Sequence, residues 1–138
     1  MIVDTMIKGI DHVAIVVWNM DRSIKFYNEV LGLRIHHDGR KEGGSKKSFL
    51  GNKSETLVAL AEDENRGKEG NRIVEGVAHI AFRVEDVEKA SKLLKERGVE
   101  FIEEKLGKDG KRKSYHFLDP DGLELEIYGR TGQIIPPY

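Results

Sequence analysis

The sequence contains one nine-residue phrase twice, and this repeat constrains the fold more than any other feature. GIDHVAIVV begins at Gly9 and GVAHIAFRV begins at Gly76, so a shift of 67 positions (76 − 9) aligns them. The same shift places His12 on His79. An internal duplication of this kind predicts two copies of one structural module, each with the same order of elements.

Each copy reads β-α-β-β-β. An apolar, β-rich stretch comes first, then Asn19 or Asp86 as a helix N-cap, then a helix that ends before Gly32 or Gly98. A further strand follows each glycine. The expected first strands are 9–17 and 76–84, the helices 20–31 and 87–97, and the later strands 46–51, 56–61, 112–118 and 123–128.

Two such modules predict an α+β fold in which the modules are related by a pseudo-twofold axis and form a cleft between their concave faces. We expect a single domain over 1–138. It comprises module 1 at about 8–62, a polar linker at 63–73, module 2 at about 74–129 and an extended C-terminal tail at 130–138. The polar, glycine-rich segment 38–48 is expected to be a loop that could close over the cleft.

Composition excludes several classes of function. The 23 basic and 24 acidic residues give a net charge of −1, so nothing favours nucleic acid or an anionic membrane as a partner. The chain has no cysteine, so any metal must be held by histidine or carboxylate side chains. No apolar run is long enough to cross a bilayer, and we expect a cytoplasmic protein.

The repeated histidines are the first candidates for chemistry. Side chains alternate along a strand, so the pseudo-twofold axis would point His12 and His79 into the cleft from equivalent places. Two histidines and a carboxylate make a site for a divalent ion. In FLDPDGLELEIYG, Glu124 and Glu126 share a face that we expect to look into the cleft, and Glu126 completes the predicted metal set.

Other polar residues could have either a functional or a purely structural role. In KSYHFL, Ser114 and His116 share the cleft face, where they could contact substrate, but a histidine on an apolar strand is more often part of the core. Glu124 is either a catalytic carboxylate or a solvated residue at the rim. His36 and His37 end a strand before a polar loop and are expected at the surface.

Three segments carry a resemblance to a known family. DHVAIVVWNMDRSIKFYNEVLGLRI, VAHIAFRVEDVEKASKLLKERGVEF and FLDPDGLELEIYG resemble the vicinal oxygen chelate superfamily. That superfamily includes glyoxalase I, bleomycin-resistance proteins, extradiol dioxygenases and fosfomycin-resistance proteins. The resemblance covers nearly the whole chain apart from the two loops and the tail, and it implies the same metal ligands, His12, His79 and Glu126.

The sequence departs from each subfamily in particular places. The resemblance to glyoxalase I implies a fourth ligand, a glutamate, at the position of Ala59 (126 − 67), and a glutathione-binding arginine at the position of Val16. Extradiol dioxygenases and fosfomycin-resistance enzymes carry a tyrosine at the position of His116. Fosfomycin-resistance enzymes also carry a serine matched by Ser114 and a threonine two residues after the first histidine, where this chain has Ala14.

The resemblance implies one divalent ion (Ni, Zn, Co, Mn or Fe), a small-molecule substrate with adjacent oxygens, and a homodimer. The first hypothesis is a glyoxalase-type lyase or isomerase, with His116 or Glu124 as general base. The alternatives are an Fe(II) extradiol-type dioxygenase, a fosfomycin-resistance-type transferase or hydrolase, and a metal-free drug-binding protein of bleomycin-resistance type.

Overall fold

The computed structural model of the chain describes residues 6–41, 45–63, 77–106 and 113–129. The chain divides into two compact units, Met1–Arg66 and Gly67–Tyr138, and each is described by itself. The predicted linker, except Asp63, and the predicted tail lie outside the described residues. The module boundaries within the single expected domain therefore stay a prediction.

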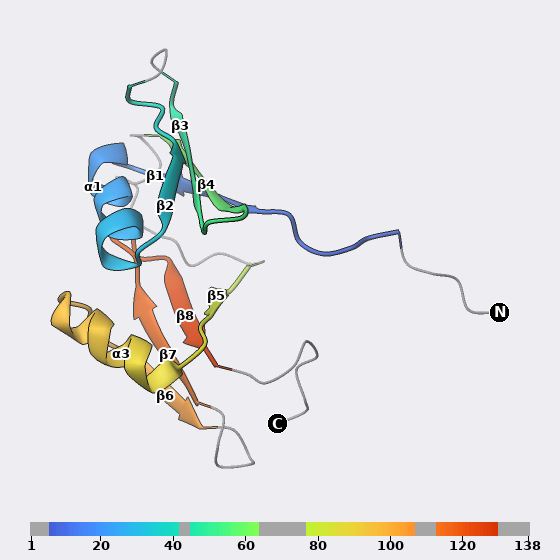
Figure 1. Cartoon of the computed structure of the whole chain (residues 1–138). Coiled ribbons are helices and arrows are strands. Elements are labelled where there is room, and N and C mark those ends of the chain that lie inside the picture. Colours follow the sequence, from blue (N-terminus) through green and yellow to red (C-terminus); the bar gives the residue numbers. More distant parts are fainter. Residues whose placement is uncertain (1–5, 42–44, 64–76, 107–112, 130–138) are drawn as a thin grey trace. The chain divides into compact units, whose positions relative to one another are not determined.

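Unit 1 contains one helical segment and a four-stranded mixed sheet (Figure 1). The strand order is β1-β4-β3-β2, with β1 parallel to β4 and the other neighbours antiparallel. The elements are β1 (Val13–Val17), α1 (Met20–Ile24), a wider π-helical turn (Lys25–Val30), β2 (Arg34–His37), β3 (Lys47–Gly51) and β4 (Thr56–Glu62).

Unit 2 repeats this topology with the strand order β5-β8-β7-β6, again with one parallel pair, β5 and β8. The elements are β5 (Ile80–Arg83), α3 (Val87–Glu96), β6 (Glu103–Leu106), β7 (Lys113–Leu118) and β8 (Glu124–Tyr128). Two β-α-β-β-β units confirm the predicted α+β fold. No helix in the described part of the chain is long and apolar enough to span a membrane.

The predicted helix boundaries are confirmed at both ends. The Asn19 side chain accepts a hydrogen bond from the backbone N–H of Arg22, and Asp86 accepts one from that of Lys89, both at 3.0 Å. Gly32 and Gly98 have φ values of 80° and 90°. Because side chains disfavour this left-handed conformation, glycine is the residue that ends each helix with the least strain.

The first helix differs from its prediction in one respect. The backbone N–H of Leu31 donates to the carbonyl of Phe26, five residues back, because the helix widens into a π-type turn over Lys25–Val30. Apolar periodicity predicts that residues 20–31 are helical, but it does not distinguish a spacing of four residues from a local spacing of five.

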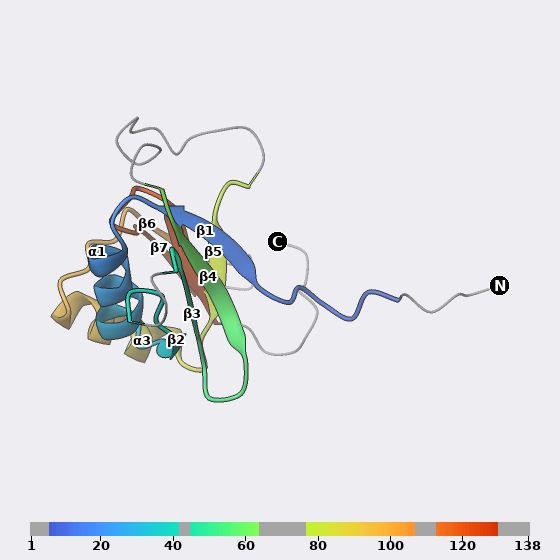
Figure 2. The ribbon, with the colours of Figure 1, turned by 90° about the horizontal axis from the view of Figure 1, so that it is seen from above.

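Each sheet carries its helix on one face, as both views of the ribbon show (Figures 1 and 2). In unit 1 the buried apolar residues include Ile15, Val17, Leu50, Val58 and Leu60 of the sheet, together with Met20, Ile24 and Tyr27. In unit 2 they include Tyr115, Phe117, Leu125, Ile127 and Leu94. The Tyr115 hydroxyl donates to Glu88 Oε1 at 2.9 Å, which fixes β7 against α3.

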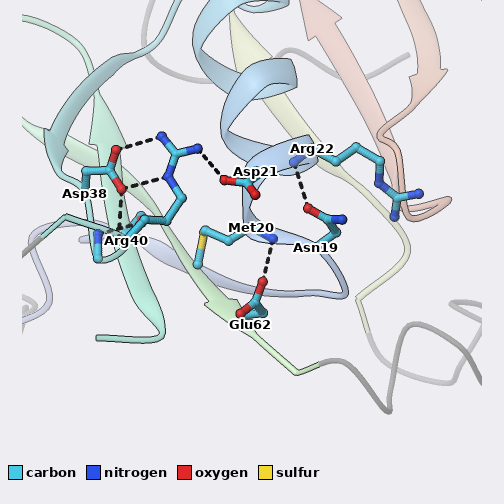
Figure 3. Close-up of polar contacts among 9 residues, drawn as sticks. Asn19, Met20, Asp21, Arg22, Asp38, Arg40 and Glu62 are labelled. Carbon is cyan, nitrogen blue, oxygen red and sulfur yellow. Dashed lines mark hydrogen bonds and ion pairs between the residues drawn. The ribbon is translucent and has the colours of Figure 1, made fainter. Parts of the chain in front are cut away.

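A charged clamp joins the start of the β2–β3 loop to α1 (Figure 3). The Arg40 guanidinium donates from Nε and Nη2 to the two oxygens of buried Asp38, at 2.9 and 2.7 Å, and from Nη1 to Asp21 at 2.7 Å. Hydrogen bonding from Arg40 lowers the pKa of Asp38 from 3.8 to about 2. The first residues of the predicted closing loop are therefore held in place.

The clamp predicts a pH-dependent contribution to stability. The pKa of Asp38 is lower in the folded chain than in the unfolded one, so its charge stabilises the fold above about pH 4, and this stabilisation is lost as the pH falls towards 2. Asp38→Asn should lower the free energy of unfolding by about 1 kcal/mol at neutral pH, because Arg40 is partly solvated. Urea unfolding measures this difference, which should shrink at the acidic end.

Asp21→Asn is the matched control. Asp21 is largely exposed and makes a single contact with the same guanidinium, so its loss should cost less than about 0.5 kcal/mol. Equal effects of the two substitutions, or a difference for Asp38→Asn that does not change with pH, would contradict the assignment of the clamp to the Asp38–Arg40 pair.

Candidate functional site

The turn between β7 and β8 aligns the polar residues of unit 2. Asp119 Oδ1 accepts hydrogen bonds from the backbone N–H groups of Asp121 and Leu123, both at 2.8 Å, and Gly122 has a φ of 86°. This tight Asp-Pro-Asp-Gly turn sets the register of the two strands. His116 consequently lies directly opposite Glu126 on the antiparallel pair.

The face of this sheet turned away from α3 carries the predicted site residues. Tyr115 and Phe117 pack on the helix side, so alternation places Ser114 and His116 on the other face, as the sequence predicts. Glu124 and Glu126 share that face through the register of β8 with β7. His79 precedes β5, whose parallel register with β8 brings it alongside Glu124.

Four of these side chains form one cluster, here named the His/Glu cluster: His79, His116, Glu124 and Glu126. His116 Nδ1 hydrogen bonds with Glu124 Oε2 at 3.0 Å, and its Nε2 lies 2.6 Å from Glu126 Oε2. His79 Nε2 lies 3.8 Å from Glu126 Oε1, and its Nδ1 lies 3.7 Å from Glu124 Oε2. The two imidazole rings cross edge to face with centroids 5.4 Å apart.

The cluster is buried at its centre and open at its rim. The side chains of His116 and Glu126 are 1% and 10% exposed, whereas those of Glu124 and His79 are 36% and 37% exposed. Within the described part of the chain, the contacts of the Glu126 carboxylate are with imidazoles and not with lysine or arginine. A buried carboxylate is unfavourable unless a positive charge or several hydrogen bonds compensate it.

One buried nitrogen of the cluster lacks a hydrogen bond. His116 Nε2 is close to Glu126 Oε2, but the two groups are not aligned for hydrogen bonding, and no other described group accepts from that nitrogen. Orphaned buried nitrogens are rare in folded proteins. His116 Nε2 is therefore an exception among the buried polar atoms of the described part of the chain.

Ser114 lies on the same face, two residues before His116. It is 4% exposed and stands opposite Tyr128 in the register of β7 and β8. Ser114 is therefore adjacent to the His/Glu cluster along the sheet. Five of the six residues that the sequence selects for the site lie in unit 2, and four of them, His79, His116, Glu124 and Glu126, are in contact.

His12 belongs to unit 1, just before β1. Its Nδ1 hydrogen bonds with Asp11 Oδ1 at 2.6 Å, and its side chain is 46% exposed. When the Nδ1 proton is donated to this carboxylate, Nε2 keeps its lone pair and can act as a ligand. The contact with Asp11 is not predicted from the alternation pattern, although a carboxylate next to a candidate ligand is a recognisable signal in the sequence.

Unit 1 offers no carboxylate at the position equivalent to Glu126. Ala59 lies in the middle of β4, where it pairs with Ala14 of β1, and it is 6% exposed. Glu62, the acidic residue at the end of β4, accepts a hydrogen bond from the backbone N–H of Met20 at 2.7 Å (Figure 3). The Glu62 carboxylate thus stabilises the start of α1 through its hydrogen bond with the Met20 backbone.

Within the described ranges, no group of three or more histidine and acidic side chains is arranged to hold a metal ion as it stands. The predicted set takes His12 from unit 1 and His79 and Glu126 from unit 2. The set therefore stays a prediction, and the His/Glu cluster of unit 2 is the part of it that the structure describes.

Known proteins resemble the whole chain. The metallothiol transferase FosB of Staphylococcus haemolyticus is 34% identical over 131 residues, which cover 94% of this chain and 87% of that protein. A probable chloroplastic lactoylglutathione lyase of Arabidopsis thaliana is 33% identical over 122 residues, which cover 86% of this chain and 35% of that protein.

A solved structure agrees with the fold. The glyoxalase family protein from Enterococcus faecalis superposes with a TM-score of 0.69 at 30% identity, covering 90% of this chain and 99% of that one. A family model described as the Glyoxalase/Bleomycin resistance protein/Dioxygenase superfamily matches residues 9–127. This match confirms the resemblance carried by the repeated strands and the Asp-Pro-Asp-Gly turn, and the chain belongs to this superfamily.

Proposed function

We propose that this protein is a divalent-metal-dependent enzyme of the glyoxalase type, a lyase or isomerase that acts on a small substrate with two adjacent oxygens. The proposed ligands are His12, His79 and Glu126. The observation that supports the proposal most is the Glu126 carboxylate, which is buried with imidazoles as its described partners. A cation bound there would compensate its charge.

The donor set fits a divalent ion. Two imidazole nitrogens and one carboxylate oxygen suit Ni, Zn, Co, Mn or Fe, and a chain without cysteine offers no thiolate to compete. When bound, such an ion supplies Lewis-acid stabilisation of negative charge on the substrate oxygens. Three protein ligands would leave coordination positions for those oxygens.

The protein's own side chains supply the acid–base function in this proposal. Glu124 hydrogen bonds with His116 at 3.0 Å and is the half-exposed member of this pair. It is therefore proposed to reach a substrate at the rim of the His/Glu cluster. His116 is buried and faces carboxylates with both ring nitrogens, which favours a role behind Glu124 rather than direct contact with substrate. Ser114 is proposed to hydrogen bond with the substrate from the neighbouring position on β7.

A fosfomycin-resistance-type transferase is the second candidate. The similarity to the metallothiol transferase FosB, which extends over 94% of this chain, favours it. The reaction of that class would use the same proposed ligands and Ser114. An Fe(II) dioxygenase and a metal-free drug-binding protein are the remaining alternatives, and neither has a specific observation in its favour.

Metal content tests the proposed ligands. The purified protein should retain about one divalent ion per chain after dialysis, and His12→Ala, His79→Ala and Glu126→Ala should each lose most of it, because each removes one of three ligands. Elemental analysis measures the stoichiometry, and circular dichroism confirms folding.

His36→Ala and Glu62→Gln serve as matched controls and should keep the ion. His36 is exposed and hydrogen bonds with Thr56 and the carbonyl of Asn52, and Glu62 is occupied at the start of α1. A protein without metal would instead support the drug-binding alternative. Full metal content in His79→Ala would show that His79 is not one of the metal ligands.

Turnover separates the candidate reactions. With metal bound, we expect conversion of a hemithioacetal, formed from a 2-oxoaldehyde and a thiol, into the thioester, measured by its ultraviolet absorbance. Several thiols should be compared, because Val16 replaces the arginine that the resemblance associates with glutathione. Thiol addition to fosfomycin without isomerase activity would favour the transferase, and oxygen uptake on a catechol would favour the dioxygenase.

A further inference from the structure

We infer that Asp11 is a positioning residue for the proposed ligand His12. Its carboxylate accepts a hydrogen bond from Nδ1 of the ring, so that Nε2 carries the lone pair that is presented to the metal ion. This inference rests on the proposed function, because it concerns the orientation of a proposed ligand. It assigns a task to a residue outside the proposed ligand set and outside the His/Glu cluster.

The hydrogen bond determines which ring nitrogen holds the proton. His12 Nδ1 lies 2.6 Å from Asp11 Oδ1, which is short for a contact between a nitrogen and an oxygen. An ionised carboxylate can only accept, so the ring is the donor and its proton lies on Nδ1. In a neutral imidazole the other nitrogen, Nε2, then has the lone pair. Histidines that bind metals commonly have a carboxylate on the nitrogen that does not bind the ion.

The surroundings of this pair leave Nε2 accessible. The His12 side chain is 46% exposed, and no other group in the described part of the chain hydrogen bonds with its ring. Among the described residues, the partner of the Asp11 carboxylate is this ring and not a lysine or arginine. A substitution at Asp11 therefore tests a single contact.

The repeat shows that the fold does not require Asp11. A shift of 67 residues places Asp11 on Ala78 (11 + 67 = 78), which precedes β5 as Asp11 precedes β1. Unit 2 has the same topology without a carboxylate at this position. The Asp11 side chain is also 94% exposed, so it adds nothing to the buried core. Asp11→Ala introduces the residue that the second copy already has, and the variant should fold.

Three variants separate orientation of the ring from attraction of the cation by charge. Asp11→Ala removes both the hydrogen-bond acceptor and the negative charge. Asp11→Asn removes the charge but keeps a carbonyl oxygen that can accept from Nδ1. Asp21→Asn is the matched control, because it removes an exposed carboxylate of unit 1 whose partner is Arg40 rather than His12.

Nitrogen NMR of the imidazole rings locates the proton in the metal-free protein, near pH 8, where imidazoles are neutral. His12 should carry its proton on Nδ1 in the wild type and in Asp11→Asn, and the proton should shift towards Nε2 in Asp11→Ala. The His12 signals are assigned from their absence in His12→Gln. The signals of His36, whose ring nitrogens contact Thr56 and Asn52, should not change.

Metal affinity measures the consequence of this orientation. The dissociation constants of Mn²⁺ and Co²⁺ are determined by competition with a chelator. They should rise about 10-fold in Asp11→Ala, which is the lower end of the range for such partners, because Asp11 is exposed. Asp11→Asn should recover part of that loss, and Asp21→Asn should bind as the wild type does.

The outcomes distinguish this inference from the proposed function. A wild-type proton on Nε2 of His12, or wild-type affinity in folded Asp11→Ala, would overturn the role of Asp11 and leave the proposed ligands in place. Equal losses of affinity in Asp11→Ala and Asp11→Asn would assign the effect to charge and would also overturn it. Failure of the wild-type protein to bind either ion would overturn both. Circular dichroism shows whether each variant is folded.

Discussion

The polar cluster of unit 2 is arranged around one buried carboxylate. Glu126 is 10% exposed and faces two imidazoles, with no lysine or arginine among its described contacts. Removing a charge from water is costly, so the fold can retain this residue only if its neighbours or a bound cation compensate it. The register of β7 with β8 and of β5 with β8 places His116 and His79 next to this carboxylate.

The two units share a backbone topology but differ in the residues on the sheet face away from the helix. Both have equivalent strand orders. Each helix begins at a residue whose side chain caps it, Asn19 or Asp86, and is followed by a glycine in the left-handed conformation. Each packs apolar side chains on the helix face of its sheet, which stabilises the module without involving the opposite face. The residues on the opposite face can therefore differ between the units. Ala59 of unit 1 occupies the position that is equivalent to Glu126 of unit 2.

The sequence predicts the elements and their faces well because these depend on local rules. Alternation along KSYHFL and LELEIY is enough to separate Tyr115 and Phe117 from Ser114 and His116. Contacts between side chains are a different matter, since they depend on register and rotamer. The sequence therefore does not reveal that His116 bridges two glutamates, that Glu62 stabilises the start of α1 or that Arg40 joins two aspartates.

Membership of the superfamily sets the fold but leaves the reaction open, because the superfamily includes glyoxalases, bleomycin-resistance proteins and dioxygenases. What distinguishes one reaction from another must then lie in the side chains around the proposed ligands. In this chain those include a buried imidazole at position 116 and a half-exposed carboxylate at position 124, in contact with each other. His116 is buried whereas Glu124 is half-exposed, so Glu124 is the group of this pair that is proposed to face a substrate.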